Sequence, residues 1–492
     1  MLTKLTTINF HRLEPFPQTV YASRFPGMSE ITILGLAGAR QQQLARRLYA
    51  IIKNSGYKYP ADRKIIDIGV IQHPWSTNYM DLGLIIGLIA LNKEYLPHNL
   101  DWQNYCLFGA LSPTGELLHT GGERIIVREM IKLNRPTTIF LNPEVDLRDL
   151  DLSQLKIVYA NNLNNVISHL TNPRTKPLSV LPSTKELQTD STSLQKTIEP
   201  IELISGQIKA KRGITIALAG GHNLALIGPP GVGKTKLMLA TMRLEPPESA
   251  DELAYTKLLS FLSDQYEYAK TGRIQELIAK NSTTKLIGNS STIGQLDFLV
   301  NGFGLIDELT LWPKEKLEQL KQKTNINLIA TLNPCPCGNL GSRTRSCECN
   351  NQQLTAYQNR FSLSLKDRFP LKIHMQPADN INNHDLIDPK LTENKIRELI
   401  SIARTRQRKR QHNKLNGQLE LPELNKLTKI SPAAEQLVNR IATSYKLSNR
   451  AELNLYRISL TIADLAQKEE IGEVEILEAL EYTNGLCALD IF

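Results

Sequence analysis

The sequence predicts an α/β protein with a helical C-terminal part, and three observations carry this prediction. Strand-like and helical segments alternate over residues 1–170 and again over residues 201–378. A glycine-rich turn, LIGPPGVGKT, follows an apolar run and precedes a helical pattern. Residues 379–492 repeat apolar side chains at three- and four-residue spacing, as amphipathic helices do. A chain of 492 residues is too long for one core, so we expect two to four domains.

The first block, residues 1–170, is predicted to be a mixed α/β domain. We expect strands at EITILGLAG, RKIIDIGVI and TTIFLNP, and helices at ARQQQLARRLYAIIKNSG and DLGLIIGLIAL. Residues 171–200 are rich in Ser, Thr and Pro and contain few large apolar residues, which is typical of a linker. The last block, residues 379–492, is predicted to be a helical bundle that contains NKIRELISIARTRQRKRQ, SPAAEQLVNRIATSY and RAELNLYRISLTIADLAQ.

Composition favours an anionic partner such as nucleic acid without requiring one. Lys and Arg number 58 against 49 Asp and Glu, which gives a net charge of +9. The N-terminus lacks a basic start followed by a long apolar core, and the apolar stretch LGLIIGLIALN is too short to cross a bilayer. We therefore expect a soluble, cytoplasmic protein with no membrane partner.

The glycine-rich turn has the spacing of a phosphate-binding loop, G-x-x-x-x-G-K-[ST]. Its glycines permit backbone conformations that turn successive N–H groups toward phosphate oxygens. Lys234 supplies a positive charge, Thr235 supplies a hydroxyl for Mg²⁺, and the helix that begins there presents its positive end. A chance glycine turn is the alternative, which the flanking strand and helix disfavour. The expected ATP-binding residues are Gly228, Pro229, Pro230, Gly231, Val232, Gly233, Lys234 and Thr235.

Two further segments complete the predicted catalytic site. NGFGLIDEL reads as a buried strand that ends in Asp307 and Glu308. Asp307 is expected to hold Mg²⁺ together with Thr235, and Glu308 to polarise the attacking water. NLIATLNP reads as another central strand with Asn333 at its tip, where the amide would contact the γ-phosphate or the water. A capping Asn before Pro is the alternative interpretation of Asn333.

Four of the six cysteines are crowded into CPCGNLGSRTRSCEC, which suggests metal binding rather than the disulfide framework of a secreted protein. Four thiolates suit tetrahedral Zn²⁺ in a structural role. The C-x-C spacing is tighter than usual, so two disulfides or free thiols are the alternatives. The candidate ligands are Cys335, Cys337, Cys347 and Cys349.

A family resemblance rests on motifs that occur in order: GQIKAKRGITIALAGGHNLALIGPPGVGKT, NGFGLIDEL, LNPCPCGNLG, CEC, LKDRF and LSNRAELNLYRISLTIADLA. The chain resembles the magnesium-chelatase-like AAA+ ATPases, and in particular the ComM/YifB group of bacterial DNA helicases. ITILGLAGARQQQLARRLYAIIKNSGYKYP and GALSPTGELLHTGG are similar to that family's N-terminal domain, which is related to the Lon protease domain. The resemblance implies a Lon-protease-like domain over 1–170, a P-loop AAA+ core with a parallel sheet over 201–378 and a helical lid over 379–492.

The resemblance also implies a ring, usually a homohexamer, with ATP between subunits. Arg368, in LKDRF, matches the arginine finger that reaches the neighbouring subunit's nucleotide, and a surface arginine is the alternative. Arg450 matches a second sensor on the lid, for which Arg457 is the alternative. Either arginine could instead face solvent or a carboxylate such as Glu452.

Two departures from the family put translocation on DNA in doubt. The stretch between Glu308 and Asn333 has room for one helix and one strand, without the pore hairpin of the relatives. The segment LIAKNSTTKLIGNSS lacks the family's histidines. A basic run could compensate through sequence-independent phosphate contacts, although such a run is more often a solvated helix face. The run comprises Arg404, Arg406, Arg408, Lys409, Arg410 and Lys414.

These features predict an AAA+ ATPase that remodels DNA, most plausibly branched recombination intermediates during uptake of transforming DNA. One alternative is a protein-remodelling or assembly ATPase that does not bind DNA, which the shortened stretch after Glu308 supports. A metal-chelatase motor subunit is a second, which the N-terminal block and the cysteine cluster disfavour. Proteolysis is disfavoured because neither Ser76 nor Ser112 has the sequence context of an activated nucleophile.

Overall fold

The computed structural model describes residues 2–483 with gaps, of which the longest are 174–197, 263–271 and 378–391. Shorter gaps fall at 12–13, 37, 60–61, 70–73, 93, 98–99, 135–136, 148, 247, 290–291, 323–325 and 412–413. The predicted linker, 171–200, therefore lies largely outside the described residues. Among the helices that the structure describes, none has the length and apolar composition needed to cross a membrane.

The chain folds into two compact units. Unit 1 comprises Met1–Gln188, Ala250–Tyr266 and Asn289–Ile293, and unit 2 comprises Thr189–Ser249, Glu267–Gly288 and Gly294–Phe492. The helical C-terminal block thus belongs to the same unit as the phosphate loop. Two short segments from the middle of the sequence belong to unit 1, which a division into consecutive blocks did not anticipate.

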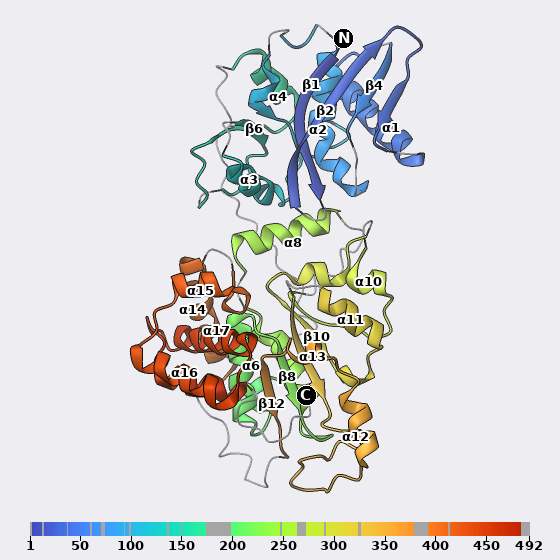
Figure 1. The fold of residues 1–492 in the computed structure, drawn as a ribbon. Coiled ribbons are helices and arrows are strands. Elements are labelled where there is room, and N and C mark those ends of the chain that lie inside the picture. The colour runs from blue at the N-terminus through green and yellow to red at the C-terminus, as the bar shows by residue number, and fades with distance from the viewer. Residues whose placement is uncertain are drawn as a thin grey trace. The chain divides into compact units, whose positions relative to one another are not determined.

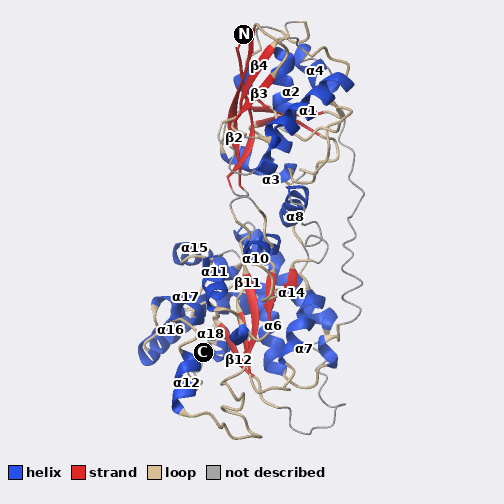
Figure 2. Ribbon diagram, turned by 90° about the vertical axis from the view of Figure 1, so that its right-hand side faces the viewer, coloured by secondary structure: helices blue, strands red, loops and turns tan. Residues whose placement is uncertain are grey.

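Unit 1 is a mixed α/β unit built on a seven-stranded sheet in the order β3-β4-β2-β1-β5-β6-β7 (Figures 1 and 2). The strands are β1 (Leu2–His11), β2 (Glu14–Phe25), β3 (Ile31–Leu34), β4 (Arg63–Asp67), β5 (Tyr105–Cys106), β6 (Thr137–Leu141) and β7 (Leu155–Tyr159). The helices are α1 (Ala39–Asn54), α2 (Asp81–Ala90), α3 (Glu123–Lys132) and α4 (Leu163–Thr171). The three strands and two helices expected here are confirmed as β3, β4, β6, α1 and α2. The long antiparallel β1–β2 pair was not predicted.

Helix α8 (Ala250–Leu262) lies in the longer of the two segments from the middle of the sequence that belong to unit 1. Arg124 of α3 donates to Asp251 of α8 at 2.7 Å, and Arg128 donates to the same carboxylate at 3.0 Å. A Cβ at Gly122 would lie 2.8 Å from the Leu258 side chain, so only a glycine allows this close approach. The contact between α3 and α8 is therefore both charged and closely packed.

Unit 2 contains a five-stranded, all-parallel sheet in the order β12-β8-β11-β10-β9. Its strands are β8 (Leu224–Ile227), β9 (Ile274–Glu276), β10 (Phe303–Ile306), β11 (Asn327–Leu332) and β12 (Leu371–His374). Alternate residues of β8 enter different apolar clusters: Leu224 and Leu226 pack with the C-terminal helices, whereas Ala225 and Ile227 pack with Trp312 and its neighbours. Both faces of the sheet are thus buried, as parallel sheets require.

The helices of unit 2 include the expected bundle, which lies together at one side of the sheet in Figure 1. In the first half of the unit they are α6 (Ile208–Gly220), α7 (Lys234–Ala240), α10 (Thr283–Ile287), α11 (Lys314–Gln322), α12 (Asn351–Gln358) and α13 (Leu363–Lys366). The bundle consists of α14 (Glu393–Gln411), α15 (Leu421–Leu427), α16 (Pro432–Tyr445), α17 (Asn449–Leu465) and α18 (Glu473–Tyr482). The three amphipathic segments expected here are confirmed as α14, α16 and α17.

The parallel sheet brings the predicted catalytic segments to one edge. In a parallel sheet all strands end at the same edge, and β11 lies between β8 and β10. The glycine-rich loop follows β8, the acidic pair follows β10, and Asn333 follows β11. Three sequence motifs up to about a hundred residues apart therefore meet at the carboxyl ends of neighbouring strands, where ligands bind in open α/β sheets.

Candidate active site

The glycine-rich loop joins β8 to α7, and its backbone has the conformation that the sequence predicts. Gly231 and Gly233 have φ of 83° and 91°, a region that favours glycine. A Cβ at Gly228 would lie 2.6 Å from the Met375 carbonyl oxygen, whereas a Cβ at Gly231 would meet no atom within 4 Å. The start of the loop is thus tightly held and its bend is open, which leaves room for phosphate oxygens in front of the N-terminus of α7.

Lys234 is the first residue of α7 and is turned into the loop. Its ammonium donates to the carbonyl oxygens of Gly228 and Pro229 at 2.7 and 2.8 Å, and to Asn333 Oδ1 at 3.1 Å. Burial lowers the pKa of Lys234, while the charges of Asp307 and Glu308 oppose that shift. A bound phosphate would supply the counter-charge in place of the two carbonyl oxygens.

A hydroxyl and a carboxylate suited to Mg²⁺ lie side by side. Thr235 Oγ1 donates to Asp307 Oδ1 at 3.0 Å. Thr331 Oγ1, from β11, donates to the same oxygen at 2.5 Å and helps to hold the carboxylate in place. Hydroxyl and carboxylate oxygens are the ligands that Mg²⁺ uses beside nucleotide phosphates, so these residues fit the predicted metal role.

Glu308 has an unusual backbone conformation, with φ of 46°. Its N–H donates to Thr331 Oγ1 at 2.9 Å, which holds the residue in this left-handed conformation. The side chain is exposed rather than packed into the core. Backbone strain of this kind often occurs at functional sites, so it agrees with the role in water activation that the sequence predicts for Glu308.

Both the side chain and the backbone of Asn333 accept hydrogen bonds. Its side-chain oxygen accepts from Lys234, and its backbone oxygen accepts from the Tyr357 hydroxyl of α12 at 2.6 Å. The amide is therefore directed at the loop and does not cap a helix. The structure thus brings Lys234, Thr235, Asp307 and Asn333 into one connected network.

The four predicted metal ligands form one cluster. Their sulfur atoms all lie within 4.8 Å of one another. Cys335, Cys337 and Cys347 are separated by 3.3, 3.7 and 3.6 Å between sulfurs. A tetrahedral Zn²⁺ with Zn–S bonds of about 2.3 Å requires roughly 3.8 Å between sulfurs, so the cluster fits the ion closely. The thiols are free, which disfavours the disulfide alternative.

Backbone N–H groups support this cluster. The Cys337 N–H donates to Cys349 Sγ at 3.4 Å, and the Leu340 N–H donates to Cys335 Sγ at 3.3 Å. The backbone N–H of Asn339 lowers the pKa of Cys337 to about 6, whereas burial raises the pKa of Cys335 to about 12. Donors that point at sulfur are typical of the second shell around metal-bound thiolates.

Arg368 and Arg450 lie at the opposite edge of the sheet from the loop. Arg368 donates to the carbonyl oxygens of Leu320 and Ile326, and its own carbonyl accepts from Asn223, the residue before β8. Burial lowers the pKa of Arg368 to about 10, and the nearby positive charge of Arg450 adds to this shift.

Arg450 and Arg457 both lie on α17 and differ in exposure. Arg450 is 3.8 Å from Asp367, the residue before Arg368, and 55% of its side chain is exposed. Arg457 is more enclosed and donates to the Leu419 carbonyl oxygen at 2.6 Å. Neither arginine joins the network around Lys234 through the contacts that the structure describes.

The basic run on α14 is not one charged helix face, and the interpretation of all its members as phosphate contacts or solvated charges is wrong. Arg404 is fully buried and donates to the Leu218 carbonyl oxygen at 2.6 Å. Arg406 and Arg410 both pair with Asp464, which is 1% exposed. The physical reason is that acceptors on α6 and α17 face this side of α14.

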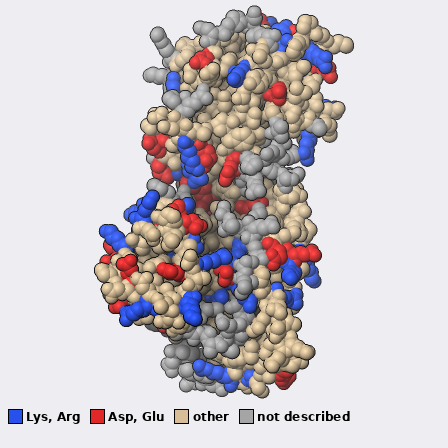
Figure 3. All heavy atoms as spheres, viewed as in Figure 1, with Lys and Arg blue, Asp and Glu red and all other residues tan. Residues whose placement is uncertain are grey.

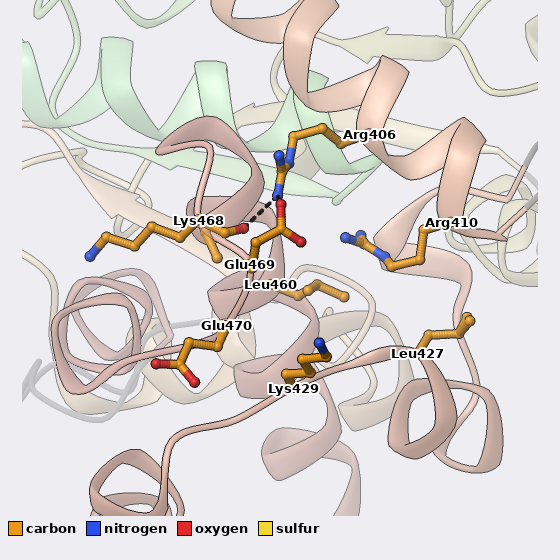
Figure 4. A pocket seen from close by; sticks show the side chains of 9 residues that line it. Arg406, Arg410, Leu427, Lys429, Leu460, Lys468, Glu469 and Glu470 are labelled. Atoms are coloured by element: carbon orange, nitrogen blue, oxygen red, sulfur yellow. Dashed lines mark hydrogen bonds and ion pairs between the residues drawn. The ribbon is translucent and has the colours of Figure 1, made fainter.

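A pocket of ≈ 100 Å³ lies where α14 meets the end of α17 (Figure 4). Its charged lining residues include Arg406, Arg410, Lys429 and Lys468, together with Glu469 and Glu470. Arg406 also pairs with Glu469 at 3.0 Å, and Lys468 pairs with Glu475 at 2.7 Å. Figure 3 likewise shows basic and acidic side chains interspersed over the C-terminal helices. Arg406, Arg410 and Lys468 are thus each engaged in an ion pair.

Of the two serines considered as protease nucleophiles, Ser112 lies in a turn that its side chain stabilises. Ser112 Oγ accepts from the N–H groups of Thr114 and Glu116 at 3.3 and 3.0 Å. No lysine contacts this hydroxyl among the hydrogen bonds of the described residues. The side chain of Ser76 lies outside the described residues.

Sequence reasoning missed two residues of the site, Thr331 and Tyr357. Thr331 is fully buried and connects Asp307 to Glu308. Its signal was a polar residue inside the otherwise apolar segment LIATL. Tyr357 carried no such signal, because its role depends on α12 folding back onto the end of β11.

Three family models match the chain, and all describe parts of a magnesium chelatase subunit. The model "Magnesium chelatase, subunit ChlI" matches residues 201–325 and 321–383. "Subunit ChlI of Mg-chelatase" matches residues 20–141, and "Magnesium chelatase, subunit ChlI C-terminal" matches residues 391–483. Together they match part of the N-terminal unit, the sheet with the phosphate loop and the helical bundle.

Curated relatives match over nearly their whole length. The uncharacterized protein YifB of Escherichia coli (strain K12) is 28% identical over 491 residues, which is 95% of this chain and 94% of the relative. The competence protein ComM of Haemophilus influenzae is 25% identical over 486 residues, 93% of this chain and 92% of the relative. An uncharacterized protein of Mycobacterium tuberculosis (strain H37Rv) is 23% identical over 493 residues, 93% of each chain. The full set of motifs, the parallel sheet and these matches agree, and the chain belongs to the magnesium-chelatase-like family of ATPases that includes the YifB and ComM proteins.

Proposed function

We propose that this protein is a ring-forming AAA+ ATPase that uses ATP hydrolysis to remodel DNA. The observation that carries the ATPase part is the network of Lys234, Thr235, Asp307 and Asn333 at one sheet edge, with Glu308 exposed beside it. The Lys234–Asn333 and Thr235–Asp307 contacts support the roles proposed for these four residues. ATP would lie along the loop, with Mg²⁺ between its phosphates and the Thr235–Asp307 pair.

The positions of the arginines support assembly into a ring. Arg368 and Arg450 lie at the amino ends of the parallel strands, and the phosphate loop lies at the carboxyl ends. The four residues of β8 alone span about 13 Å at 3.3 Å per residue. These arginines therefore cannot contact ATP bound to their own chain without large rearrangement, whereas they could contact ATP of a neighbouring copy. We infer that Arg368 acts as the finger and Arg450 as a sensor in such a contact, in a homohexamer.

The proposal that DNA is the substrate rests on similarity to a competence protein and not on a DNA-binding surface of this structure. The relative from H. influenzae is named a competence protein, which accords with branched or single-stranded DNA during transformation and recombination. The burial of Arg404 and the ion pairs of Arg406 and Arg410 weigh against these three residues as DNA contacts. A protein-remodelling role is the second candidate, and it is favoured by the short segment between Glu308 and Asn333, whose described residues include α11 and β11.

One experiment separates these candidates. ATP turnover is measured with and without forked DNA, beside size-exclusion chromatography in ATP and Mg²⁺. Stimulation by DNA together with a larger assembled species supports the DNA motor, and unstimulated basal turnover supports a protein remodeller. Lys234→Ala should abolish binding or turnover, and Glu308→Gln should retain ATP, stabilise the ring and lower kcat by about 10²- to 10⁴-fold. Unchanged hydrolysis by Glu308→Gln would contradict the assignment of the water-activating residue.

A further inference from the structure

We propose that the four cysteines bind one Zn²⁺ and that the bound ion sets the ATP affinity of the phosphate loop. The proposal rests on the proposed ATPase function and adds a metal-dependent control of the same site. It is carried by three contacts that join the cysteine cluster to the loop and to Asn333. The three contacts involve different residues of the chain.

The first contact passes through Asn333. The chain leaves Asn333, enters the cluster at Cys335, and leaves it at Cys349. Helix α12 begins within two residues of Cys349, and its Tyr357 hydroxyl returns to the Asn333 carbonyl oxygen at 2.6 Å. The segment that carries the four cysteines therefore begins at Asn333 and is connected back to Asn333 through Tyr357. Asn333 is the residue that contacts Lys234.

The second contact is direct packing on the phosphate loop. Gly338, between the two cysteine pairs, has φ of 82°, and a Cβ there would lie 2.6 Å from Pro230 Cδ. The backbone of the cysteine segment thus lies against the middle of the loop. If the cysteine segment moved, it would either push against the phosphate loop or no longer pack against it.

The third contact is a pair of glutamine amides. Gln376 donates to the Gly341 carbonyl oxygen at 3.0 Å, and Gln207 donates to the Gln376 carbonyl oxygen at 2.7 Å. The Gln207 amide also lies 3.4 Å from the Val232 carbonyl oxygen of the phosphate loop. The cysteine segment is thereby connected to both sides of the bend that would hold the phosphates.

A metal ion is the natural means of ordering this segment. Residues 333–350 contain neither helix nor strand. Such a segment has few backbone hydrogen bonds of its own, so four metal–sulfur bonds would decide which conformation it adopts. If the ion is absent and the supporting conformation is populated to only about 10%, the apparent Kd for ATP rises about tenfold.

The test uses the full-length protein and measures zinc and ATP binding separately. Zinc per chain is measured by mass spectrometry of the metal, and the Kd for a fluorescent ATP analogue by titration. We expect one Zn²⁺ per chain, its loss in Cys337→Ser, and an ATP Kd about tenfold higher in that variant. Arg345→Ala, an exposed residue of the same segment, is the matched control and should change neither quantity.

A second variant separates the link from the metal. Tyr357→Phe removes only the hydroxyl that contacts Asn333, so it should keep its zinc and still weaken ATP binding by roughly five- to tenfold. Linkage also requires that saturating ATP raises the zinc affinity of the wild-type protein by the same factor by which zinc raises ATP affinity. This reciprocal measurement, made with a competing zinc chelator, decides the question even if Cys337→Ser fails to fold.

The outcomes are distinguishable. Wild-type protein without zinc, or equal zinc affinity with and without ATP, would overturn the proposal while leaving the ATPase assignment intact. Wild-type protein that holds zinc but binds no ATP would instead overturn the proposed function.

Discussion

Replacement of Thr331 by valine gives a direct test of how the acidic pair is positioned. Valine keeps the shape of the side chain but removes the hydroxyl. In the structure this hydroxyl donates to Asp307 Oδ1 at 2.5 Å and accepts from the Glu308 N–H at 2.9 Å. Thr331 is fully buried, so water cannot replace either hydrogen bond.

The magnitude follows from these two hydrogen bonds. Loss of a typical hydrogen bond costs about 1 kcal/mol, and a buried N–H left without an acceptor costs about 1–3 kcal/mol. The total of about 2–4 kcal/mol corresponds to a factor of about 30 to 1,000 in rate if it falls on the hydrolysis step. We expect it to do so, because in the proposed mechanism Asp307 and Glu308 act on Mg²⁺ and water, whereas Lys234 and the loop amides bind ATP.

The assay is phosphate release as a function of ATP concentration, together with the Kd for a fluorescent ATP analogue. Thr331→Val should lower kcat by the factor above and change the Kd for ATP by less than about threefold, about 0.7 kcal/mol. Thr331→Ser retains the hydroxyl and should remain close to wild type. A Thr331→Val protein with kcat within about twofold of wild type, or about 0.4 kcal/mol, would refute the positioning role.

Three further predictions concern other parts of the structure. Arg124→Ala removes the shorter of the two ion pairs of Asp251 and should lower the free energy of unfolding of unit 1, measured in urea, by about 3–5 kcal/mol. Arg128 is more exposed, so Arg128→Ala should lower it by about 1 kcal/mol or less. Equal effects of the two substitutions would contradict the α3–α8 contact. Burial lowers the pKa of His222 from 6.5 to about 3, so the folded protein keeps this imidazole neutral while the unfolded chain protonates it below pH 6.5. The contribution of His222 to the free energy of unfolding is therefore fully present above pH 6.5 and is lost as pH falls. Stability should drop by about 2 kcal/mol between pH 7 and pH 5 from this residue, and His222→Asn should remove that part of the pH dependence in urea unfolding. Gly338→Ala should keep its zinc and raise the Kd for ATP about tenfold, because alanine is strained at φ of 82° and its Cβ would push into the phosphate loop; an unchanged Kd would count against the contact.

The candidate catalytic residues could be selected from the sequence because local physics dictates their sequence patterns. A phosphate loop needs glycines at fixed spacing and a helix that begins at lysine, and both requirements are met within a dozen consecutive residues. Buried parallel strands are short apolar runs, so the polar residues that follow them, such as Asp307 and Asn333, stand out in the sequence. The assignment of these motifs to the ends of neighbouring strands then followed from the geometry of parallel sheets.

The sequence alone determined which residues form the loop, the acidic pair and the cysteine cluster, because each is a contiguous pattern with its own chemical meaning. Only the tertiary structure decided that α8 packs with unit 1, that Arg404 is buried, and that Tyr357 and Gly338 connect the cysteines to the loop. These features depend on which surfaces meet after the chain has folded. A charged or aromatic residue has the same sequence signature whether its partner is water or a carbonyl oxygen from a distant strand.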